Sequence, residues 1–463
     1  MISRWEVPRG RNLSLWQKIT PPQLFVGSFA ILALSGAAGL HWLPGLYTGE
    51  RLGWLDALFM STSAVCVTGL IVVDTATFFT PLGQAYLLLL IQLGGLGMIA
   101  FTSLIILALG GRLSLRQEAL SAANLEGAPQ IDTRRLVFDV VRFTLALEGV
   151  GALLLYFLWI PRFGVWGALW PAVFHSVSAF CNAGFSVFSD SLISFQDAPF
   201  SLSVVMLLIV AGGLGFLTLE ELWLHYHAAR RKLAFRVSLH TRIVLSTTAL
   251  LILVGWILFS IFEWNATLGQ QGWLGKLANA LFMSVTSRTA GFNTIDYAQV
   301  SDSANFLTIL LMTIGGSPGS TAGGIKTTTF ALIGLLAWSR YCGEEVTSAW
   351  SRSLREESTD RAVGLFVMAF GVITTGILVL TVTERALGAD RHFLRCMFEA
   401  ASAFNTVGLS MGITSALSPA GKWVIIVLMF VGRVGPLTFA AAIVLRRLDM
   451  GRFRYAYEEV AVG

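Results

Sequence analysis

The chain alternates between long apolar stretches and short polar segments that are mostly basic. Six of the stretches contain no Asp, Glu, Lys or Arg, and two more contain only a few such residues. Because a helix needs about 20 apolar residues to cross the hydrocarbon core of a bilayer, this pattern predicts eight membrane crossings. They cover approximately residues 19–49, 75–111, 136–160, 198–219, 243–262, 303–325, 362–383 and 422–445.

The composition indicates the same class of protein. Hydrophobic residues make up 55% of the 463 positions and charged residues only 13%, whereas about a quarter of the residues of a soluble protein are charged. A disordered chain is excluded too, because it lacks this apolar mass. We therefore expect an all-α polytopic membrane protein embedded in the lipid bilayer.

The basic residues indicate the orientation. Most of the 32 Lys and Arg residues fall on one side of the predicted crossings, in the N-terminal segment, in alternate loops and in the C-terminal tail. Cytoplasmic loops carry such an excess, so both termini are expected to be cytoplasmic. The net charge of +5 then reflects topology. No basic patch interleaved with aromatic residues suggests a nucleic-acid partner.

Four similar octapeptides recur along the chain, each at the end of a hydrophobic run too short to span a membrane. They are Ser63–Leu70, Ser178–Phe185, Val285–Phe292 and Ser402–Leu409, all with glycine seventh and Leu or Phe eighth. A second glycine cluster follows each at a nearly constant distance, at 94–97, 212–215, 315–319 and 432–436. For Gly94, Gly95, Gly212 and Gly213 alone, close helix packing is the simpler explanation.

Because the octapeptides and the glycine clusters recur in the same order, we expect four tandem repeats of helix, pore loop and helix. The repeats would cover residues 19–111, 112–230, 231–345 and 346–448, between a cytoplasmic N-terminal segment 1–18 and a cytoplasmic tail 449–463. The short apolar runs before the octapeptides, at about 54–65, 166–180, 273–287 and 392–404, are expected to be pore helices. The C-terminal end of such a helix favours a cation.

Glycine-containing loops at membrane depth need a physical reason, since non-helical backbone is tolerated there only where it is buried or lines a wet cavity. Four such loops meet this condition if they surround a central pore with pseudo-fourfold symmetry, where their carbonyl oxygens replace the water around a cation. Glycine permits the backbone angles that aim the carbonyls inward. The expected ion-binding residues are Val67, Thr68, Gly69, Asn182, Ala183, Gly184, Thr289, Ala290, Gly291, Thr406, Val407 and Gly408.

The second helix of the third repeat cannot be continuous, because five glycines and a proline fall within ten residues. We expect an intramembrane loop below the pore loops, made of Gly315, Gly316, Ser317, Pro318, Gly319, Ser320, Thr321, Ala322, Gly323, Gly324 and Lys326. A nucleotide-binding P-loop is excluded here, because Ile325 separates Gly324 from Lys326 and no strand precedes the motif.

Ionisable residues inside apolar segments suggest function or a specific partner. Arg433 either donates to carbonyls of the intramembrane loop, or pairs with a carboxylate such as Glu399, or extends its side chain toward the interface. Arg288 is expected behind the third octapeptide, bracing it. Glu399 and His175 share one register before their glycines and are candidates for support of the pore loops, with simple packing an equal explanation for His175.

These motifs resemble a known family. The four-repeat layout and the runs 287–294, 316–327 and 432–438 are similar to the Trk/Ktr/HKT superfamily of potassium transporters, most closely to its KtrB type of membrane subunit. In that superfamily, glycine in all four filters accompanies potassium selectivity, whereas serine in the first filter accompanies sodium in some plant relatives. The resemblance implies potassium uptake into a bacterial cell across its inner or plasma membrane, with a sodium-permeable relative as the alternative.

The resemblance also implies further properties. The loop 315–326 would be a gate, K⁺ the transported ion, and Na⁺ an activator in some members. The membrane subunit would form a homodimer, with 455–463 as a candidate contact, and would bind a cytoplasmic KtrA-like ring that carries ATP, ADP or NAD. No organic cofactor is expected on this chain.

An intramembrane enzyme and an alternating-access transporter are the two rival functions. An intramembrane enzyme acting on a lipid would need paired carboxylates or a Ser/His set at membrane depth, and the apolar segments offer little beyond Glu399 and His175. An alternating-access transporter built from inverted repeats would contain units of opposite orientation. Here each expected repeat has two crossings and runs the same way, which favours a parallel pore assembly over alternating access. We therefore expect a pore, and the missing catalytic set indicates that the chain is not an enzyme.

Overall fold

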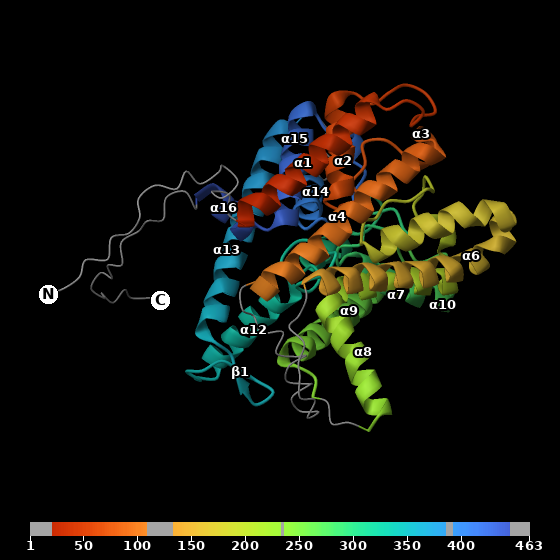
Figure 1. Ribbon diagram of the computed structural model, residues 1–463. Helices are drawn as coiled ribbons and strands as arrows, with labels where there is room; N and C mark the ends of the chain where they lie inside the picture. Colours follow the sequence, from red (N-terminus) through yellow and green to blue (C-terminus); the bar gives the residue numbers. More distant parts are fainter. Residues whose placement is uncertain (1–20, 109–132, 233–235, 386–391, 445–463) are drawn as a thin grey trace.

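The computed structural model describes residues 21–108, 133–232, 236–385 and 392–444 (Figure 1). Within these ranges the chain is almost entirely helical, apart from a two-stranded hairpin of β1 (Ser348–Ala349) and β2 (Arg352–Ser353). The expected all-α architecture is therefore confirmed. The predicted terminal segments 1–18 and 449–463 lie outside the described residues.

The first two repeats each contain a long helix, a pore helix and a return helix. The first repeat comprises α1 (Pro21–Trp42), α2 (Trp54–Val65), the short α3 (Thr75–Phe78) and α4 (Pro81–Ala108). The second comprises α6 (Thr133–Phe180), η2 (Ile193–Phe195), α7 (Pro199–Leu214) and α8 (Phe216–Arg230). Gly164 divides α6 into an outgoing helix and a pore helix, because its φ of +73° is not helical. Glycine suits this position, since a residue with a side chain rarely adopts that angle.

The last two repeats follow the same plan. The third comprises α9 (Leu239–Glu263), α10 (Trp273–Thr286), α11 (Asp302–Thr313) and α12 (Thr327–Tyr341). The fourth comprises α13 (Glu356–Thr383), α14 (His392–Phe404), η3 (Thr414–Ala416), α15 (Pro419–Val434) and α16 (Pro436–Val444). The pore helices α2, α10 and α14 begin at the predicted residues, and α2 and α14 end there as well.

The repeats are arranged in a closed circle. Each return helix packs against the pore helix of the next repeat, in the pairs α4 with α6, α7 with α10, α11 with α14 and α15 with α2. The last pair is tied by an ion pair of 2.6 Å between Lys422 and Asp56. The largest apolar core accordingly joins the first repeat to the fourth and to the end of α6. Figure 1 shows the first and last repeats side by side.

Several return helices are broken, which corrects two predicted crossings. The stretch 198–219 breaks at Gly215 (φ +81°), where α8 turns 102° away from α7. The stretch 422–445 breaks at Gly435 (φ +89°), where α16 turns 95° away from α15. Both stretches were expected to be single helices, and that expectation was wrong, because a glycine in the left-handed region ends each one.

The number of crossings can be compared with the expected eight. Among the described residues, four helices are long and apolar enough to cross a membrane, or six if each bent pair counts as one span. The other two expected crossings correspond to α4, whose portion Pro81–Gly97 is a shorter apolar helix, and to the interrupted pair α11 and α12. The chain is a multi-pass membrane protein built of apolar helices.

Candidate functional site

The four octapeptides adopt one repeated backbone conformation at the ends of the pore helices. In each, the seventh residue is a glycine with positive φ: Gly69 at +95°, Gly184 at +69°, Gly291 at +83° and Gly408 at +93°. Two residues earlier, each has a second positive φ, at Val67, Asn182, Thr289 and Thr406. The four loops therefore share one backbone conformation, and glycine adopts its positive φ without the cost that a side chain would bring.

The four glycines form a closed ring. A Cβ on Gly69 would lie 2.4 Å from the carbonyl oxygen of Ala183, and a Cβ on Gly184 would lie 2.9 Å from that of Ala290. The contact continues from Gly291 to the oxygen of Val407 at 2.5 Å, and returns from Gly408 to the oxygen of Thr68 at 2.2 Å. Any side chain at these positions would therefore strike backbone, and the predicted convergence of the loops is present. The ring is hereafter called the glycine ring.

Hydroxyl groups fix the loops from behind. The amides of Gly69 and Gly408 each donate to a serine hydroxyl six residues earlier, Ser63 and Ser402, at 3.1 Å. In the second repeat Ser178 instead donates to the carbonyl of Phe185 at 2.8 Å. In the third, Thr286 donates to the carbonyl of Phe292 at 2.6 Å. We did not predict these braces, although serine opens three of the four octapeptides.

His175 and Glu399 occupy equivalent places and bind equivalent partners. Nε2 of His175 lies 2.9 Å from the hydroxyl of Ser186, two residues beyond Gly184. Glu399 accepts from the hydroxyl of Ser410 at 2.8 Å, two residues beyond Gly408, and also from Thr414. Both side chains are fully buried. They therefore hold the segments that leave the glycine ring.

Arg288 binds the interrupted return helix of its own repeat. Its guanidinium is buried and donates to the carbonyl of Gly315, at 3.4 Å, in the interrupted return helix. This is the only hydrogen bond found for that side chain within the described ranges. The carbonyl of Gly315 in the broken helix is thus the partner of this long side chain, and its role in bracing the third octapeptide remains a prediction.

The stretch 314–326 forms a loop between α11 and α12, as predicted. Its two ends are joined by a parallel bridge between Ile314 and Ile325, and the amide of Gly315 donates to the carbonyl of Ile325 at 2.8 Å. Its first half binds the break between α7 and α8. The amide of Ser317 donates to the carbonyl of Gly213 at 2.9 Å, and the amide of Phe216 donates to that of Gly319 at 3.2 Å.

The loop also contacts the octapeptides directly. The hydroxyl of Thr321 lies 3.1 Å from the side-chain amide of Asn182 and donates to the carbonyl of Phe180 at 3.2 Å. A Cβ on Gly323 would lie 2.2 Å from the hydroxyl oxygen of Thr406. The loop is thus seated against the second and fourth octapeptides, on the side where their pore helices end. A side chain at Gly323 would push it away.

Arg433 holds this loop from the fourth repeat. The side chain is fully buried and donates to the carbonyl of Thr321 and, at 3.1 Å, to that of Gly94 in α4. Glu399 is bound to Ser410 and Thr414 instead, so the alternative pairing of these two residues is not present in the described part of the chain. Lys326 completes the cationic set by donating to the carbonyl of Ala322 at 2.6 Å.

Several glycines in the clusters that follow the octapeptides allow close helix packing, which was the simpler explanation offered for them. A Cβ on Gly94 would lie 2.0 Å from the carbonyl of Val65, and one on Gly212 would lie 1.9 Å from that of Phe180. Gly432 stands in the same relation to Phe404, at 1.6 Å. These glycines let the return helices touch the ends of the pore helices.

Polar oxygens without partners gather near the glycine ring. In the described residues the buried hydroxyls of Thr68, Thr289 and Thr406 have no hydrogen-bond partner. Buried polar groups are normally satisfied, so oxygens left open here suit a cation. No group of three or more His, Cys, Asp or Glu side chains able to hold a metal ion occurs in the part of the chain that is described. The oxygens available are backbone and hydroxyl oxygens.

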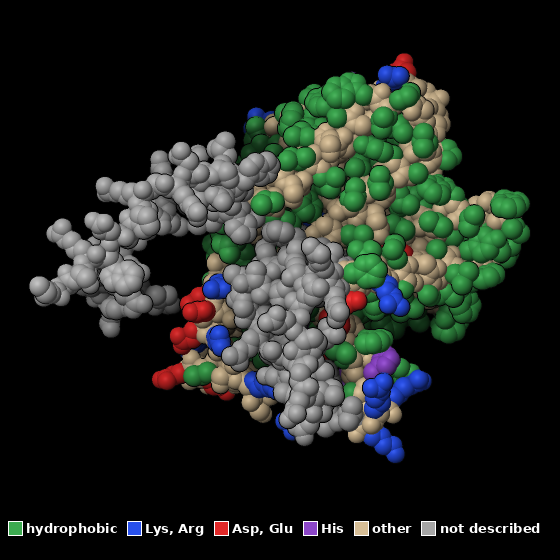
Figure 2. All heavy atoms as spheres, in the orientation of Figure 1, with side chains coloured by type: hydrophobic (Ala, Val, Ile, Leu, Met, Phe, Trp, Pro, Cys, Tyr) green, Lys and Arg blue, Asp and Glu red, His purple; other side chains and the backbone are tan. Residues whose placement is uncertain are grey.

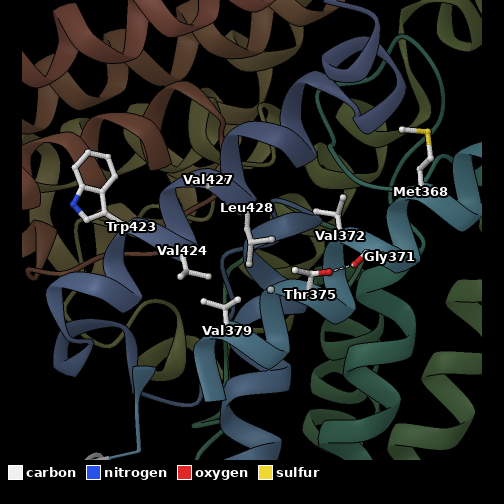
Figure 3. Close-up of a pocket in the computed structure, with 10 residues that line it drawn as sticks. Met368, Gly371, Val372, Thr375, Val379, Trp423, Val424, Val427 and Leu428 are labelled. Atoms are coloured by element: carbon white, nitrogen blue, oxygen red, sulfur yellow. Dashed lines mark hydrogen bonds between the residues drawn. The ribbon is translucent and has the colours of Figure 1, made fainter. Parts of the chain in front are cut away.

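A surface groove lies apart from this site. A groove of about 590 Å³ lies between α13 and α15 and is lined by apolar side chains such as Val372, Val379 and Leu428 (Figure 3). Its one hydroxyl, on Thr375, is already bonded to the carbonyl of Gly371 at 2.8 Å. The groove therefore offers nothing to a cation.

Comparison with known proteins places the chain among cation transporters. Residues 26–450 match the family model TrkH, described as cation transport protein. The chain is 38% identical over 452 residues to the potassium/sodium uptake protein NtpJ of Enterococcus hirae, covering 96% of this chain and 98% of the relative. It is also 38% identical over 457 residues to the Ktr system potassium uptake protein B of Bacillus subtilis, covering 97% of this chain and 98% of the relative.

A solved structure shares the fold. The crystal structure of the potassium transporter TrkH from Vibrio parahaemolyticus matches with a TM-score of 0.73 at 20% identity, covering 93% of this chain and 86% of that one.

Proposed function

The chain belongs to the TrkH family of cation transport proteins, and we propose that it takes up potassium through a single-chain pore whose selectivity filter is the glycine ring. It is a transporter and not an enzyme, as its relatives indicate. The observation that carries the proposal is the closed contact from Gly69 through Gly184, Gly291 and Gly408 back to Thr68. Four short segments, one from each repeat, meet there.

The ring suits a cation that has lost its water. Carbonyl oxygens replace the hydration shell of an ion in such a filter, and the expected ligands are Val67, Thr68, Gly69, Asn182, Ala183, Gly184, Thr289, Ala290, Gly291, Thr406, Val407 and Gly408. The ends of the pore helices add their partial negative charge on the same side. Potassium is favoured because glycine occupies all four ring positions. The name of the relative NtpJ, a potassium/sodium uptake protein, supports sodium as the second candidate ion.

The loop 315–326 is proposed to be the gate. It lies against Asn182 and Thr406 at the inner ends of two octapeptides, in the path that an ion would take after leaving the ring. Arg433 holds it by two carbonyls, and a fixed guanidinium there opposes the passage of a cation. Arg288 and Lys326 add two further positive charges, so the closed gate combines a steric barrier with an electrostatic one.

Regulation and assembly are proposed from the family. The relatives called Ktr system potassium uptake protein B suggest a partner subunit, for which we propose a cytoplasmic ring that binds ATP, ADP or NAD. We also propose a homodimer, activation by Na⁺, and a cell membrane in which both termini are cytoplasmic. The candidate dimer contact 455–463 lies outside the described residues.

Liposomes containing the purified full-length chain test the transport function. We expect release of internal K⁺ on addition of an ionophore for the counter-ion, and a much slower release of Na⁺. Empty liposomes and liposomes carrying Gly408→Ala protein, in which the ring is blocked, are the controls. Equal release of both ions would favour the sodium-permeable alternative. No release, with growth at low external K⁺ unrescued both with and without a regulatory subunit, would refute potassium uptake.

A further inference from the structure

We propose that α8 carries a binding surface for anionic phospholipid headgroups on the face formed by Trp223, Tyr226 and Arg230 together with the adjoining Arg231 and Lys232. This surface is separate from the glycine ring and the gate loop. It is called the α8 face below. The proposal does not depend on which ion the protein transports.

The direction of α8 makes the proposal possible. The helix turns 102° away from α7 at Gly215. With α7 taken as the membrane-crossing part of the pair, α8 lies close to the plane of the bilayer and does not continue across. Its 15 residues span about 22 Å at the usual rise. A helix that lies in this plane places one face toward the protein and another toward the headgroups.

The protein side of α8 is fixed firmly. The buried carboxylate of Glu221 accepts from the hydroxyl of Ser238 at 2.7 Å and from Thr241, at the beginning of α9. At its other end, the first amide of α8, that of Phe216, donates to Gly319. The orientation of the opposite face is therefore set by the fold. A headgroup bound there would sit on a helix that touches the gate loop.

The outer face combines aromatic and cationic side chains. Trp223 and Tyr226 are 53% and 51% exposed, large fractions for such residues. With Arg230 they follow the spacing of three and four that aligns side chains on one helical face. The Arg230 guanidinium lies 4.8 Å from the centre of the Tyr226 ring, and the ring of His227 lies 4.1 Å from that of Trp223, tilted by 42°. Tryptophan and tyrosine are typical of the headgroup level of a bilayer.

Charge complementarity identifies the occupant. Arg230, Arg231 and Lys232 are consecutive and exposed, and Arg236 and Arg242 are exposed nearby. Figure 2 shows Lys and Arg side chains gathered around a histidine at the far end of α8. Clusters of basic residues beside a membrane segment bind anionic lipids, with about 1 kcal/mol for each Lys or Arg near the surface. The positive-inside rule explains why basic residues are on this side, but not the exposed aromatic pair aligned with them.

A second basic region supplies a matched control. Arg352, Arg355 and Arg361 are also exposed, but Glu356, Glu357 and Asp360 lie among them, and Arg361 pairs with Glu357 at 3.9 Å. That region has little net charge and should not attract anionic lipid.

The test uses the purified full-length protein in detergent and measures its affinity for added phosphatidylglycerol and phosphatidylcholine. For the triple variant Arg230→Gln, Arg231→Gln and Lys232→Gln, we expect the affinity for phosphatidylglycerol to fall on the order of 100-fold, since each basic residue contributes roughly a factor of five. The control Arg352→Gln, Arg355→Gln and Arg361→Gln should change it less than about twofold. Phosphatidylcholine should bind weakly to all three proteins.

A fluorescence measurement locates the lipid. Brominated phosphatidylglycerol should quench the tryptophan fluorescence of the wild-type protein more than that of Trp223→Phe. In the background of the α8 triple variant, proteins with and without Trp223 should be quenched equally. The proposal is overturned if the α8 variant, folded as judged by its thermal transition, keeps its affinity for phosphatidylglycerol. It is equally overturned if the control variant loses as much affinity, or if Trp223→Phe is quenched as strongly as the wild type. An α8 variant that keeps its lipid affinity but loses an acidic protein partner would assign the face to that partner.

Discussion

Gly408 of the fourth repeat lies against the carbonyl oxygen of Thr68 in the first, so closely that a Cβ would come within 2.2 Å of that oxygen. Residues 340 positions apart in the chain thus close the ring that the other three contacts begin. A chain of four tandem repeats can form one pore only if the fourth repeat contacts the first. The contact of Gly408 with Thr68 and the ion pair between Lys422 and Asp56 join these two repeats.

Replacing Gly69 by Ser should weaken discrimination between potassium and sodium. The new Cβ would meet the Ala183 oxygen at 2.4 Å and would be strained at φ +95°, so one quarter of the ring must shift. We expect the ratio of K⁺ to Na⁺ flux to fall on the order of tenfold, as for loss of about 1.4 kcal/mol. Gly412→Ser is the control, because Gly412 has φ +85° but open space around it. An unchanged ratio in Gly69→Ser would count against the filter.

Deleting residues 316–323 should raise potassium flux. The deletion is feasible because the ends of the loop already meet, as the bridge between Ile314 and Ile325 shows. Removal of the loop takes away the segment seated against Asn182 and Thr406, and with it the barrier below the ring. Liposome flux per folded protein measures the effect. A deletion protein with an unaltered thermal transition and reduced flux would show that the loop is part of the pathway and not a gate.

Arg433→Ala should also increase flux. The variant loses two hydrogen bonds from a charged donor, each worth about 1.5–3 kcal/mol, to the carbonyls of Thr321 and Gly94. The closed loop is then held less tightly. Arg433→Lys keeps the charge without the two-pronged contact, so it should lie between the wild type and Arg433→Ala. Currents identical in all three proteins would leave Arg433 with a packing role alone.

Glu399→Ala should reduce both stability and selectivity. It leaves the hydroxyls of Ser410 and Thr414 without their acceptor, which costs about 1–3 kcal/mol for a buried group and loosens the segment beyond Gly408. Glu384→Ala is the matched control, because Glu384 is also buried and binds Ser418 at the beginning of α15, outside the octapeptides. We expect similar losses of thermal stability in both variants but altered ion selectivity only in Glu399→Ala. Altered selectivity in both would mean that the effect is a general loss of stability.

Much of the architecture could be predicted because it depends on local pattern. The pore helix Trp54–Val65 is a short apolar run that ends in a glycine motif, and both limits are visible in the sequence. The break at Gly215 was missed because residues 212–215 read Gly-Gly-Leu-Gly, as do residues 94–97 of the first repeat, where α4 passes Gly97 without a break. The break at Gly435 was missed as well, because residues 432–435 share the first and last glycine of that motif. Whether such a glycine breaks its helix depends on tertiary partners, such as Pro318 and Gly319 beside Gly215.

In the site, too, features that follow from local sequence could be predicted, whereas those that depend on tertiary contacts could not. The converging glycines were predicted from their spacing, and the interrupted return helix from its density of Gly and Pro. The target of Arg288 was not predicted, because a long side chain can reach any of several carbonyls and the sequence does not say which one is left free. The hydroxyl braces could have been found, since Ser63, Ser178 and Ser402 hold the same position in their octapeptides.

The most direct measurement is the position of the ion itself. Crystals of the full-length protein soaked in Tl⁺, a heavy substitute for K⁺, would reveal bound cations by anomalous scattering. The glycine ring predicts peaks enclosed by the carbonyl oxygens of Thr68, Ala183, Ala290 and Val407. The same protein in liposomes should carry a flux of Tl⁺. If it does so, but the crystals show ordered Tl⁺ peaks elsewhere and none within that ring, the account is contradicted.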